Sequence, residues 1–460
     1  MENLLVTGYA AEGKSLAKHE GKVIFMENAV PGDIVTVRLV KNKKDWAEGQ
    51  VIAITGYSEE RILPFCSHFG ICGGCQWQML PYEKQLEYKQ DQVLQSLKRI
   101  GKLELPDIKP ILGSEKTIRY RNKLEYTFSN RRYLLKEELG NSEISVLQNA
   151  AGFHARGIFD KIVDVDTCWL QEEPTNEIRK EIKRWALEKE ASFYDIQRHT
   201  GWLRNVQVRI CRTGEIMVNI VFGELDESLQ TALLDHIKNR FPQITTLLHT
   251  LNRKWNDSLN DLHPVVFHGN GYVIEKLEDF SFKIGPKSFF QTNTAQAERL
   301  YQTIRGLAAL QGSETIYDLY CGTGSIGIFL SPLVKKIVGI ELIAEAIADA
   351  KENALLNQIH HAAFFTGDVT AVCDDAFFAE NGRPDLIVSD PPRAGMTEKL
   401  IAKLLEIAAE KIIYVSCNPA TQARDLHLLS EKYQISAVQP VDMFPHTLHI
   451  ENVTALFLKH

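Results

Sequence analysis

Cys417 and Glu451 are two side chains near the C-terminus whose types could act one after the other on a single substrate. A thiolate adds readily to an electron-poor ring carbon, and a carboxylate close by can afterwards remove a proton. Cys417 directly follows a strand-like run, at the expected ligand-facing edge of a sheet. We therefore predict a nucleophile there rather than a buried structural cysteine. Glu451 is its predicted general base, with His446 and His449 as alternatives.

A glycine-rich turn from Asp318 to Gly327 could bring a nucleotide close to the backbone. Its Gly-x-Gly-x-x-Gly pattern alone would also suit a dinucleotide enzyme. Glu341 ends the next strand-like run, where a carboxylate can accept hydrogen bonds from both ribose hydroxyls. Asp318 would repel a pyrophosphate but not the cationic methionine portion of S-adenosylmethionine, which we therefore predict as the cofactor. Asp368 is placed for the adenine amino group, and Asp390 enters a rigid double proline that can hold a carboxylate against a ligand.

Three of the eight cysteines share one short loop. Cys66, Cys72 and Cys75 supply three thiolates beside two glycines, and Cys168 could supply a fourth. In a chain expected in a reducing compartment, such clustering indicates metal binding rather than disulfides. Four thiolates suit either a 4Fe–4S cluster or zinc, and their spacing does not distinguish the two.

Residues 286–460 must supply the framework for the nucleophile and the glycine-rich turn. Strand-like runs alternate there with helical patterns, which predicts an α/β, Rossmann-like domain with a mostly parallel seven-stranded sheet. Ligands of such sheets bind beyond the carboxyl ends of the strands. The strand-like runs are 315–319, 336–341, 363–366, 385–389, 411–416 and 452–458, and the main helical stretches are 343–357 and 397–410.

Two further parts precede this region. Residues 1–58 contain short strand-like runs with turn signals, which predict an OB-like β-barrel of a type that often binds RNA. Residues 59–285 are expected to form a central α+β domain that carries the cysteine loop. Strand-like runs are at 22–26, 34–40, 49–54, 122–128, 206–211 and 215–221, and helical patterns at 82–100 and 175–189.

Charge and hydropathy exclude several classes of protein. A net charge of -7 argues against nonspecific coating of nucleic acid, although basic patches such as 119–123 remain available. No apolar run reaches the roughly 20 residues that span a bilayer, and the N-terminus lacks a secretory pattern. We therefore expect a cytoplasmic protein that is not bound to a membrane, and a monomer.

The chain resembles the RNA uracil-5-methyltransferase family, in particular its iron–sulfur branch acting on ribosomal RNA. The resemblance covers essentially the whole chain and is most specific in the C-terminal half. It rests on Phe289-Phe290-Gln291, Asp318-Leu319-Tyr320-Cys321-Gly322-Thr323-Gly324, Ser389-Asp390-Pro391-Pro392-Arg393, Ser416-Cys417-Asn418-Pro419 and Asp442-Met443-Phe444-Pro445-His446-Thr447 with His449 and Glu451.

The resemblance implies a role for each predicted site residue. Cys417 would attack carbon-6 of uracil, which makes carbon-5 reactive, and Glu451 would remove the carbon-5 proton after methyl transfer. The N-terminal barrel would be a TRAM domain, and the four cysteines would hold a 4Fe–4S cluster. Residues implied at the S-adenosylmethionine site are Gln291, Tyr320, Glu341, Asp368, Asp390 and Ser325, where relatives can carry Asn.

The expected substrate is 23S ribosomal RNA, at a single-stranded or flipped uridine, because stacking and pairing hide carbon-5 and carbon-6. Transfer RNA is the alternative substrate. A noncatalytic iron–sulfur RNA-binding protein is an alternative function, which the presence of both Cys417 and Glu451 disfavours. An amino-group methyltransferase is a third alternative, but Arg393 stands where that class usually has an aromatic residue.

Overall fold

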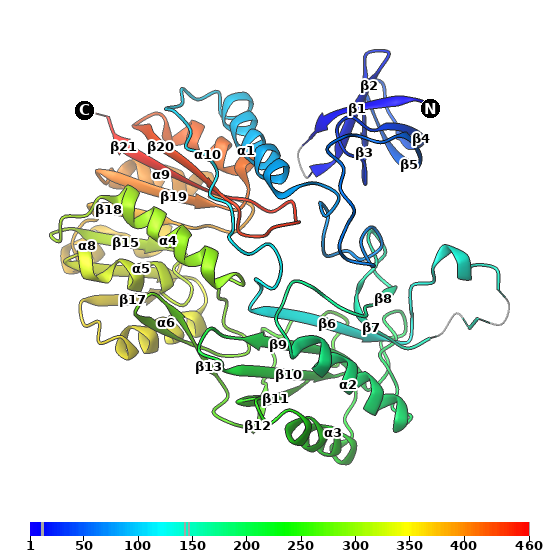
Figure 1. Cartoon of the computed structure of the whole chain (residues 1–460). Coiled ribbons are helices and arrows are strands. Elements are labelled where there is room, and N and C mark those ends of the chain that lie inside the picture. The colour runs from blue at the N-terminus through cyan, green and yellow to red at the C-terminus, as the bar shows by residue number, and fades with distance from the viewer. Residues whose placement is uncertain (11–12, 142–143, 146–147, 460) are drawn as a thin grey trace.

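The N-terminal strands close into a five-stranded barrel (Figure 1). The computed structural model describes residues 1–10, 13–141, 144–145 and 148–459. Alternate side chains such as Leu4, Val6 and Ile24 are buried inside the barrel, as expected when successive residues of a strand face opposite sides. The predicted barrel is therefore confirmed. In order round it, the strands are β1 (Leu4–Tyr9), β2 (Ser15–His19), β3 (Lys22–Met26), β5 (Trp46–Gly56) and β4 (Ile34–Asn42).

The middle part of the chain forms a mixed seven-stranded sheet, in the lower part of the view in Figure 1. β10 and β11 are parallel, and the other neighbours are antiparallel. Helices α2 (Thr175–Glu188) and α3 (Glu227–Arg240) bury residues such as Ile182 and Leu233 in the same hydrophobic core as the strands. The order is β12 (Val265–His268), β11 (Thr246–Leu251), β10 (Ile216–Phe222), β9 (Leu203–Ile210), β6 (Lys123–Ser129), β7 (Ala150–His154) and β8 (Ile162–Asp164).

The C-terminal sheet has the predicted Rossmann-like arrangement. Six of its strands point in the same direction, and β21 runs antiparallel to both of its neighbours. The order is β17 (Ala362–Thr366), β16 (Lys336–Glu341), β15 (Thr315–Leu319), β18 (Leu386–Ser389), β19 (Lys411–Ser416), β21 (Glu451–Leu458) and β20 (Tyr433–Val441). The helices of this region are α4 (Thr294–Ala308), α5 (Ser325–Leu330), α6 (Ala344–Leu356), α7 (Val369–Val372), α8 (Asp375–Asn381), α9 (Glu398–Ile407) and α10 (Pro419–Leu429).

The helix that follows the cysteine loop, α1 (Tyr82–Arg99), lies beside α10 rather than on the central sheet (Figure 1). Its Val93 and Leu97 are buried in the same cluster as Leu426 of α10. This packing anchors the end of the cysteine loop to the C-terminal sheet. A two-stranded hairpin, β13 (Val273–Leu277) and β14 (Phe280–Ile284), connects the central sheet to α4.

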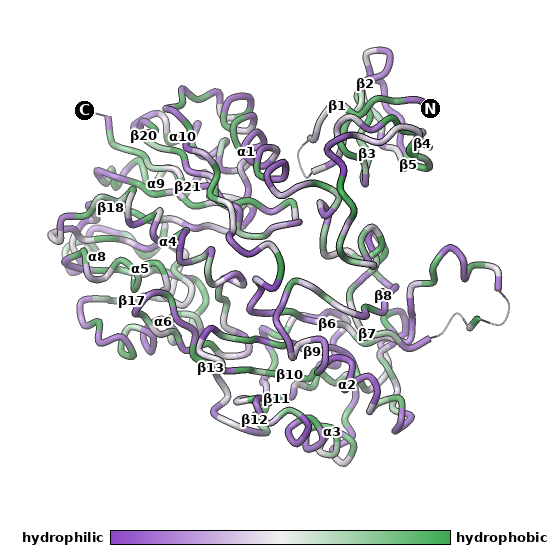
Figure 2. The backbone as a smooth tube through the Cα atoms, viewed as in Figure 1, coloured by the Kyte–Doolittle hydropathy of each residue, from purple (hydrophilic) through white to green (hydrophobic). Residues whose placement is uncertain are grey.

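Hydropathy follows this layered arrangement. Hydrophobic segments run through the interior of the central and C-terminal sheets, whereas much of the outer loop and helix surface is hydrophilic (Figure 2). The inner strands of the C-terminal sheet carry fully buried side chains such as Ile316 and Ile412, consistent with a sheet covered on both faces. Within the described ranges, no helix is long and apolar enough to cross a membrane.

Candidate active site

The carboxyl ends of β15, β16, β18 and β19 meet at one edge of the C-terminal sheet. The strand register pairs Leu319 with Ser389, and Ser389 with Tyr414, so the residues that follow these strands are neighbours. The backbone N–H of Asp390 also donates to the carbonyl of Leu319 over 3.4 Å. Four of the predicted site residues lie at this edge: Tyr320, Glu341, Asp390 and Cys417.

The glycine-rich turn requires glycine at Gly324, for its backbone angle and for its packing inside the domain. Gly324 has a φ of +76°, and a Cβ atom there would lie only 3.0–3.1 Å from Phe364 and Ala350. Glu341 faces this turn, because its carboxylate accepts from the N–H of Gly322 at 3.3 Å and of Ile343 at 3.0 Å. The predicted ribose-binding carboxylate is thus held beside the turn, as the sequence led us to expect.

Asp318 lies beneath the turn, where it is buried. One carboxylate oxygen accepts from the N–H of Gly327 at 2.9 Å, and the other has no partner within the described chain. Burial, followed by the charges of Asp390 and Glu341, raises the pKa of Asp318 to about 7. The hydrogen bond that Asp318 accepts from Gly327 stabilises the turn from inside the domain.

The other predicted cofactor residues surround this edge with different local partners. Ser325 shares a hydrogen bond of 2.8 Å with the Tyr301 hydroxyl. The Asp368 carboxylate caps α7 by accepting from the N–H of Thr370 at 2.8 Å. Hydrogen bonds from the hydroxyl and the backbone N–H of Thr370 lower the pKa of Asp368. Gln291 lies on the segment before α4, and its carbonyl accepts from the Asn122 side chain at 2.9 Å.

Cys417 and Glu451 lie at adjacent strand ends. Ser416 of β19 pairs with Asn452 of β21, so in an antiparallel pair the next residues, Cys417 and Glu451, come together. Burial raises the pKa of Glu451, and the neighbouring Asp390 raises it further. The pKa of Asp390 is itself raised to about 7 by burial. The structure thus brings a thiol and two buried carboxyl groups together, and their mutual repulsion favours protonated forms in the ligand-free protein.

The alternative bases have other surroundings. The His446 ring is buried, contacts the Gln85 amide over 3.1 Å, and has its pKa lowered to about 4 by burial. Burial, followed by Arg393 and Arg121, lowers the pKa of His449. His446 is therefore engaged with α1, whereas Glu451 lies beside the thiol.

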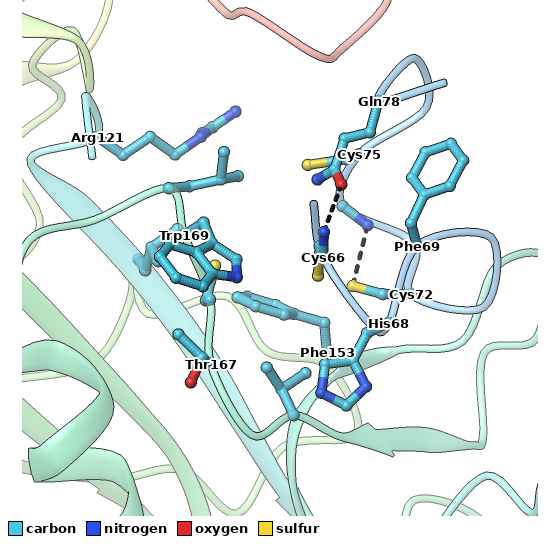
Figure 3. A pocket seen from close by; sticks show the side chains of 15 residues that line it. Cys66, His68, Phe69, Cys72, Cys75, Gln78, Arg121, Phe153, Thr167 and Trp169 are labelled. Atoms are coloured by element: carbon cyan, nitrogen blue, oxygen red, sulfur yellow. Dashed lines mark hydrogen bonds between the residues drawn. The ribbon is translucent and has the colours of Figure 1, made fainter. Parts of the chain in front are cut away.

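The four clustered cysteines line one pocket (Figure 3). It has a volume of about 180 Å³, opens to solvent, and is walled by apolar side chains such as Phe153 and Trp169. Arg121 extends from the wall opposite Cys75 (Figure 3). Burial raises the pKa of Cys75 to about 11 and that of Cys168 to about 12.

The predicted metal centre is not confirmed by this geometry. Across the residues that the structure describes, no group of three or more His, Cys, Asp or Glu side chains could hold a metal ion. All four predicted ligands, Cys66, Cys72, Cys75 and Cys168, nevertheless line the same pocket.

Comparison with known proteins assigns the family. Residues 2–52 match the TRAM domain, 300–413 the methyltransferase small domain, and 379–460 the tRNA (uracil-5-)-methyltransferase family. A protein of Bacteroides thetaiotaomicron named uncharacterized RNA methyltransferase is 48% identical over 98% of this chain and 100% of its own. A protein of Chlorobaculum tepidum with the same description is 39% identical over 98% of this chain and 95% of its own.

A solved structure extends the similarity to three dimensions. The tRNA (uracil-54, C5)-methyltransferase of Pyrococcus abyssi, in complex with S-adenosyl-L-homocysteine, superposes with a TM-score of 0.76 at 28% identity. The match covers 99% of this chain and 100% of that one. The chain belongs to the RNA uracil-5-methyltransferase family. The protein therefore combines an S-adenosylmethionine-dependent methyltransferase domain with a TRAM barrel. Its substrate is an RNA.

One charged neighbour in this methyltransferase's site was hard to foresee from the sequence. Arg393 lies close enough to Cys417 to lower its pKa and close enough to His449 to affect that ring. The available signal was its place in Asp390-Pro391-Pro392-Arg393, directly after β18. By type alone, Arg393 marks only a departure from the amino-group methyltransferases.

The ionisation of Cys417 yields a pH prediction for the ligand-free methyltransferase. Burial, then Glu451 and Asp390, raise the pKa of Cys417 to about 11. Because only the thiolate is alkylated, its modification by iodoacetamide should accelerate with rising pH up to about pH 11. Glu451→Gln removes one neighbouring anion and should move this profile to lower pH. Peptide mass spectrometry follows Cys417 separately from the other cysteines; a midpoint at the ordinary thiol pKa, unaffected by Glu451→Gln, would contradict this electrostatic description.

Proposed function

We propose that the protein methylates carbon-5 of a uridine in 23S ribosomal RNA through a covalent bond between Cys417 and the uracil ring. The observation that carries this proposal is the strand register that brings Cys417 and Glu451 together. A noncatalytic iron–sulfur RNA-binding protein would need neither residue.

The chemistry of this chain's residues follows from that pair. Cys417 loses its proton to solvent, and its Sγ bonds to carbon-6, which gives an enolate with a nucleophilic carbon-5. When bound, S-adenosylmethionine supplies the methyl group for carbon-5 and is itself converted to S-adenosylhomocysteine. The Glu451 carboxylate then takes the proton from carbon-5, the C5–C6 double bond re-forms, and Sγ is expelled. Glu451 must be ionised for this step. The sulfonium charge of bound S-adenosylmethionine would favour loss of the Glu451 proton before methyl transfer, because S-adenosylhomocysteine no longer carries that charge.

The cofactor proposal rests on donors and acceptors along the sheet edge. Glu341 would accept from the ribose hydroxyls, and Asp368 would contact the adenine amino group. Asp390, between the glycine-rich turn and Cys417, would lie against both the cofactor and the uracil. The remaining proposed contacts are Gln291, Tyr320 and Ser325. The partly exposed carboxylates of Glu341 and Asp368 and the tight turn at Gly324 fit a cationic nucleoside.

The four cysteines support a 4Fe–4S cluster in this proposal. All four thiols line one pocket, and the resemblance to the iron–sulfur branch favours a cluster over zinc, which four thiolates would also suit. Cys66, Cys72, Cys75 and Cys168 would hold it. Methyl transfer involves no electron transfer, so the role of a bound cluster would be structural. It would make the cysteine loop rigid.

Anaerobic purification tests the cluster. We expect iron together with acid-labile sulfide in the wild-type protein. Cys75→Ser should lose most of both, because a ligand is removed, whereas Cys373→Ser, at a buried cysteine outside the pocket, should keep them. Zinc without sulfide, or iron that survives Cys75→Ser, would contradict the proposal.

The choice of RNA rests on the cysteine set, which supports the ribosomal branch of the family. Transfer RNA is the second candidate, because the Pyrococcus abyssi protein of similar structure is a tRNA (uracil-54, C5)-methyltransferase. Purified protein should be incubated with unmodified 23S ribosomal RNA and with transfer RNA transcripts, and 5-methyluridine then mapped in each. We expect the modification in ribosomal RNA. Methylation confined to transfer RNA would reject the substrate, and methylation of neither RNA would reject the activity.

We further propose that the enzyme acts as a monomer in the cytoplasm. The cofactor turn, Cys417 and Glu451 all come from one chain, and ribosomal RNA supplies the reason for the compartment. Light scattering of the protein in solution checks the first part: a stable dimer would contradict it.

A further inference from the structure

The backbone that leads into Glu451 is held by donors from distant parts of the chain. Between β20 and β21, the segment Asp442–His446, here named the base loop, presents four consecutive carbonyl groups that all accept hydrogen bonds. The donors are the Asn293 side chain to Met443 (2.9 Å), Lys89 to Phe444 (3.2 Å), the Tyr120 hydroxyl to Pro445 (3.0 Å), and the N–H groups of Gln76 and Trp77 to His446 (2.8 and 3.1 Å).

One face of α1 provides side chains that form hydrogen bonds with the base loop. Tyr82, Gln85 and Lys89 are spaced at i, i+3 and i+7, so they lie on the same side of the helix. Tyr82 donates to Asp442 at 2.8 Å, and the fully buried Lys89 forms an ion pair with Asp442 at 2.6 Å. Removing one partner of such a buried pair is strongly destabilising, so it is unsuitable for testing a subtle role.

Gln85 connects the base loop to the segment at the end of the cysteine loop. Its side-chain carbonyl accepts from the N–H of His446 at 2.9 Å, and its side-chain N–H group contacts the carbonyls of Trp77 and Leu80, each at 3.0 Å. Gln85 is fully buried. The Gln85 amide therefore adds a side-chain link between the base loop and the segment after Cys75, beside the direct hydrogen bonds of Gln76 and Trp77 to His446.

Tyr120 holds the same loop from the central part of the chain. Its ring is buried, and its hydroxyl donates to the carbonyl of Pro445. Because Glu451 is the first residue of β21, its carboxyl group is placed by the backbone that leads into it. A loop displaced by about 1 Å can reduce a proton-transfer rate about 100-fold.

We propose that Gln85 and Tyr120 are positioning residues that set Glu451 for removal of the carbon-5 proton. The inference rests on the proposed function. It predicts a defect confined to the second half of the reaction, because neither residue adjoins Cys417 or the glycine-rich turn in the sheet. Thiol addition and methyl transfer proceed, while proton removal slows and the methylated Cys417–RNA adduct persists.

Gln85→Leu and Tyr120→Phe test this, with Gln95→Leu as the matched control on the partly exposed side of α1. Under single-turnover conditions with unmodified 23S ribosomal RNA and methyl-labelled S-adenosylmethionine, two quantities are followed: S-adenosylhomocysteine formed and labelled adduct that resists denaturant. Gln85→Leu should change the first by less than about 2-fold and slow adduct decay by about 10-fold. Tyr120→Phe should act in the same direction more weakly, and Gln95→Leu should match the wild type.

Two outcomes would overturn the inference. In the first, S-adenosylhomocysteine formation and adduct decay slow equally in Tyr120→Phe and in a folded Gln85→Leu protein. In the second, adduct decay is unchanged in both variants. Melting temperatures show whether a parallel loss reflects unfolding in Gln85→Leu, in which case Tyr120→Phe decides. Failure of the proposed function looks different, because the wild type would then form no 5-methyluridine and Glu451→Gln no adduct.

Discussion

Cys417→Ala should reduce uridine methylation by at least about 10³-fold, because without Sγ the uracil carbon-5 stays electron-poor. The same substitution should leave S-adenosylmethionine binding nearly unchanged, since the glycine-rich turn and Glu341 belong to other strand ends. The rate is measured by transfer of a labelled methyl group to RNA, and cofactor binding by calorimetry.

Cys373→Ala is the matched control for this experiment. Cys373 is a buried cysteine of the same domain, just after α7, and it does not follow β19. We expect that variant to keep most of its activity. Methylation by Cys417→Ala at an undiminished rate would show that the thiol has no part in the reaction.

Glu451→Gln should trap the enzyme on its substrate. The amide cannot accept the carbon-5 proton, so turnover should fall by about 10²–10⁴-fold, while addition of Cys417 and one round of methyl transfer still occur. A denaturant-resistant protein–RNA complex that contains the labelled methyl group should therefore accumulate.

Glu431→Gln makes the same chemical change at the exposed turn before β20 and should behave as the wild type. Complexes are resolved on denaturing gels, and the label is counted in the shifted band. A Glu451→Gln protein that turns over normally, or that forms no complex while still binding RNA, would assign proton removal to another group.

The strands at the active-site edge were predictable because each is a short run of apolar, largely β-branched residues followed by a turn. β15, β16 and β19 begin and end where the pattern placed them. β20 was not predicted, since exposed and intermediate residues alternate in its first half and Pro440 lies near its end. β1 and β2 were missed for a similar reason: they are short and interrupted by polar residues.

The candidate catalytic residues could be named from the sequence because side-chain type and strand position coincide. The support of the base loop was not, since five of its hydrogen bonds are accepted by four backbone carbonyls, which have no sequence signature. Likewise, α1 has an amphipathic pattern that predicts a helix, but the pattern cannot say that its apolar face packs on α10. Such pairings depend on tertiary structure.

RNA in which the target uridine is replaced by 5-fluorouridine provides the most direct test of the covalent reaction. Fluorine at carbon-5 cannot be removed as a proton, so the sequence of steps should stop after methyl transfer. After digestion with protease and ribonuclease, mass spectrometry should find the Cys417 peptide joined through sulfur to a 5-methyl-5-fluoro-5,6-dihydrouridine nucleotide. Complete binding of this RNA with no adduct, or an adduct on any other cysteine, would contradict the account.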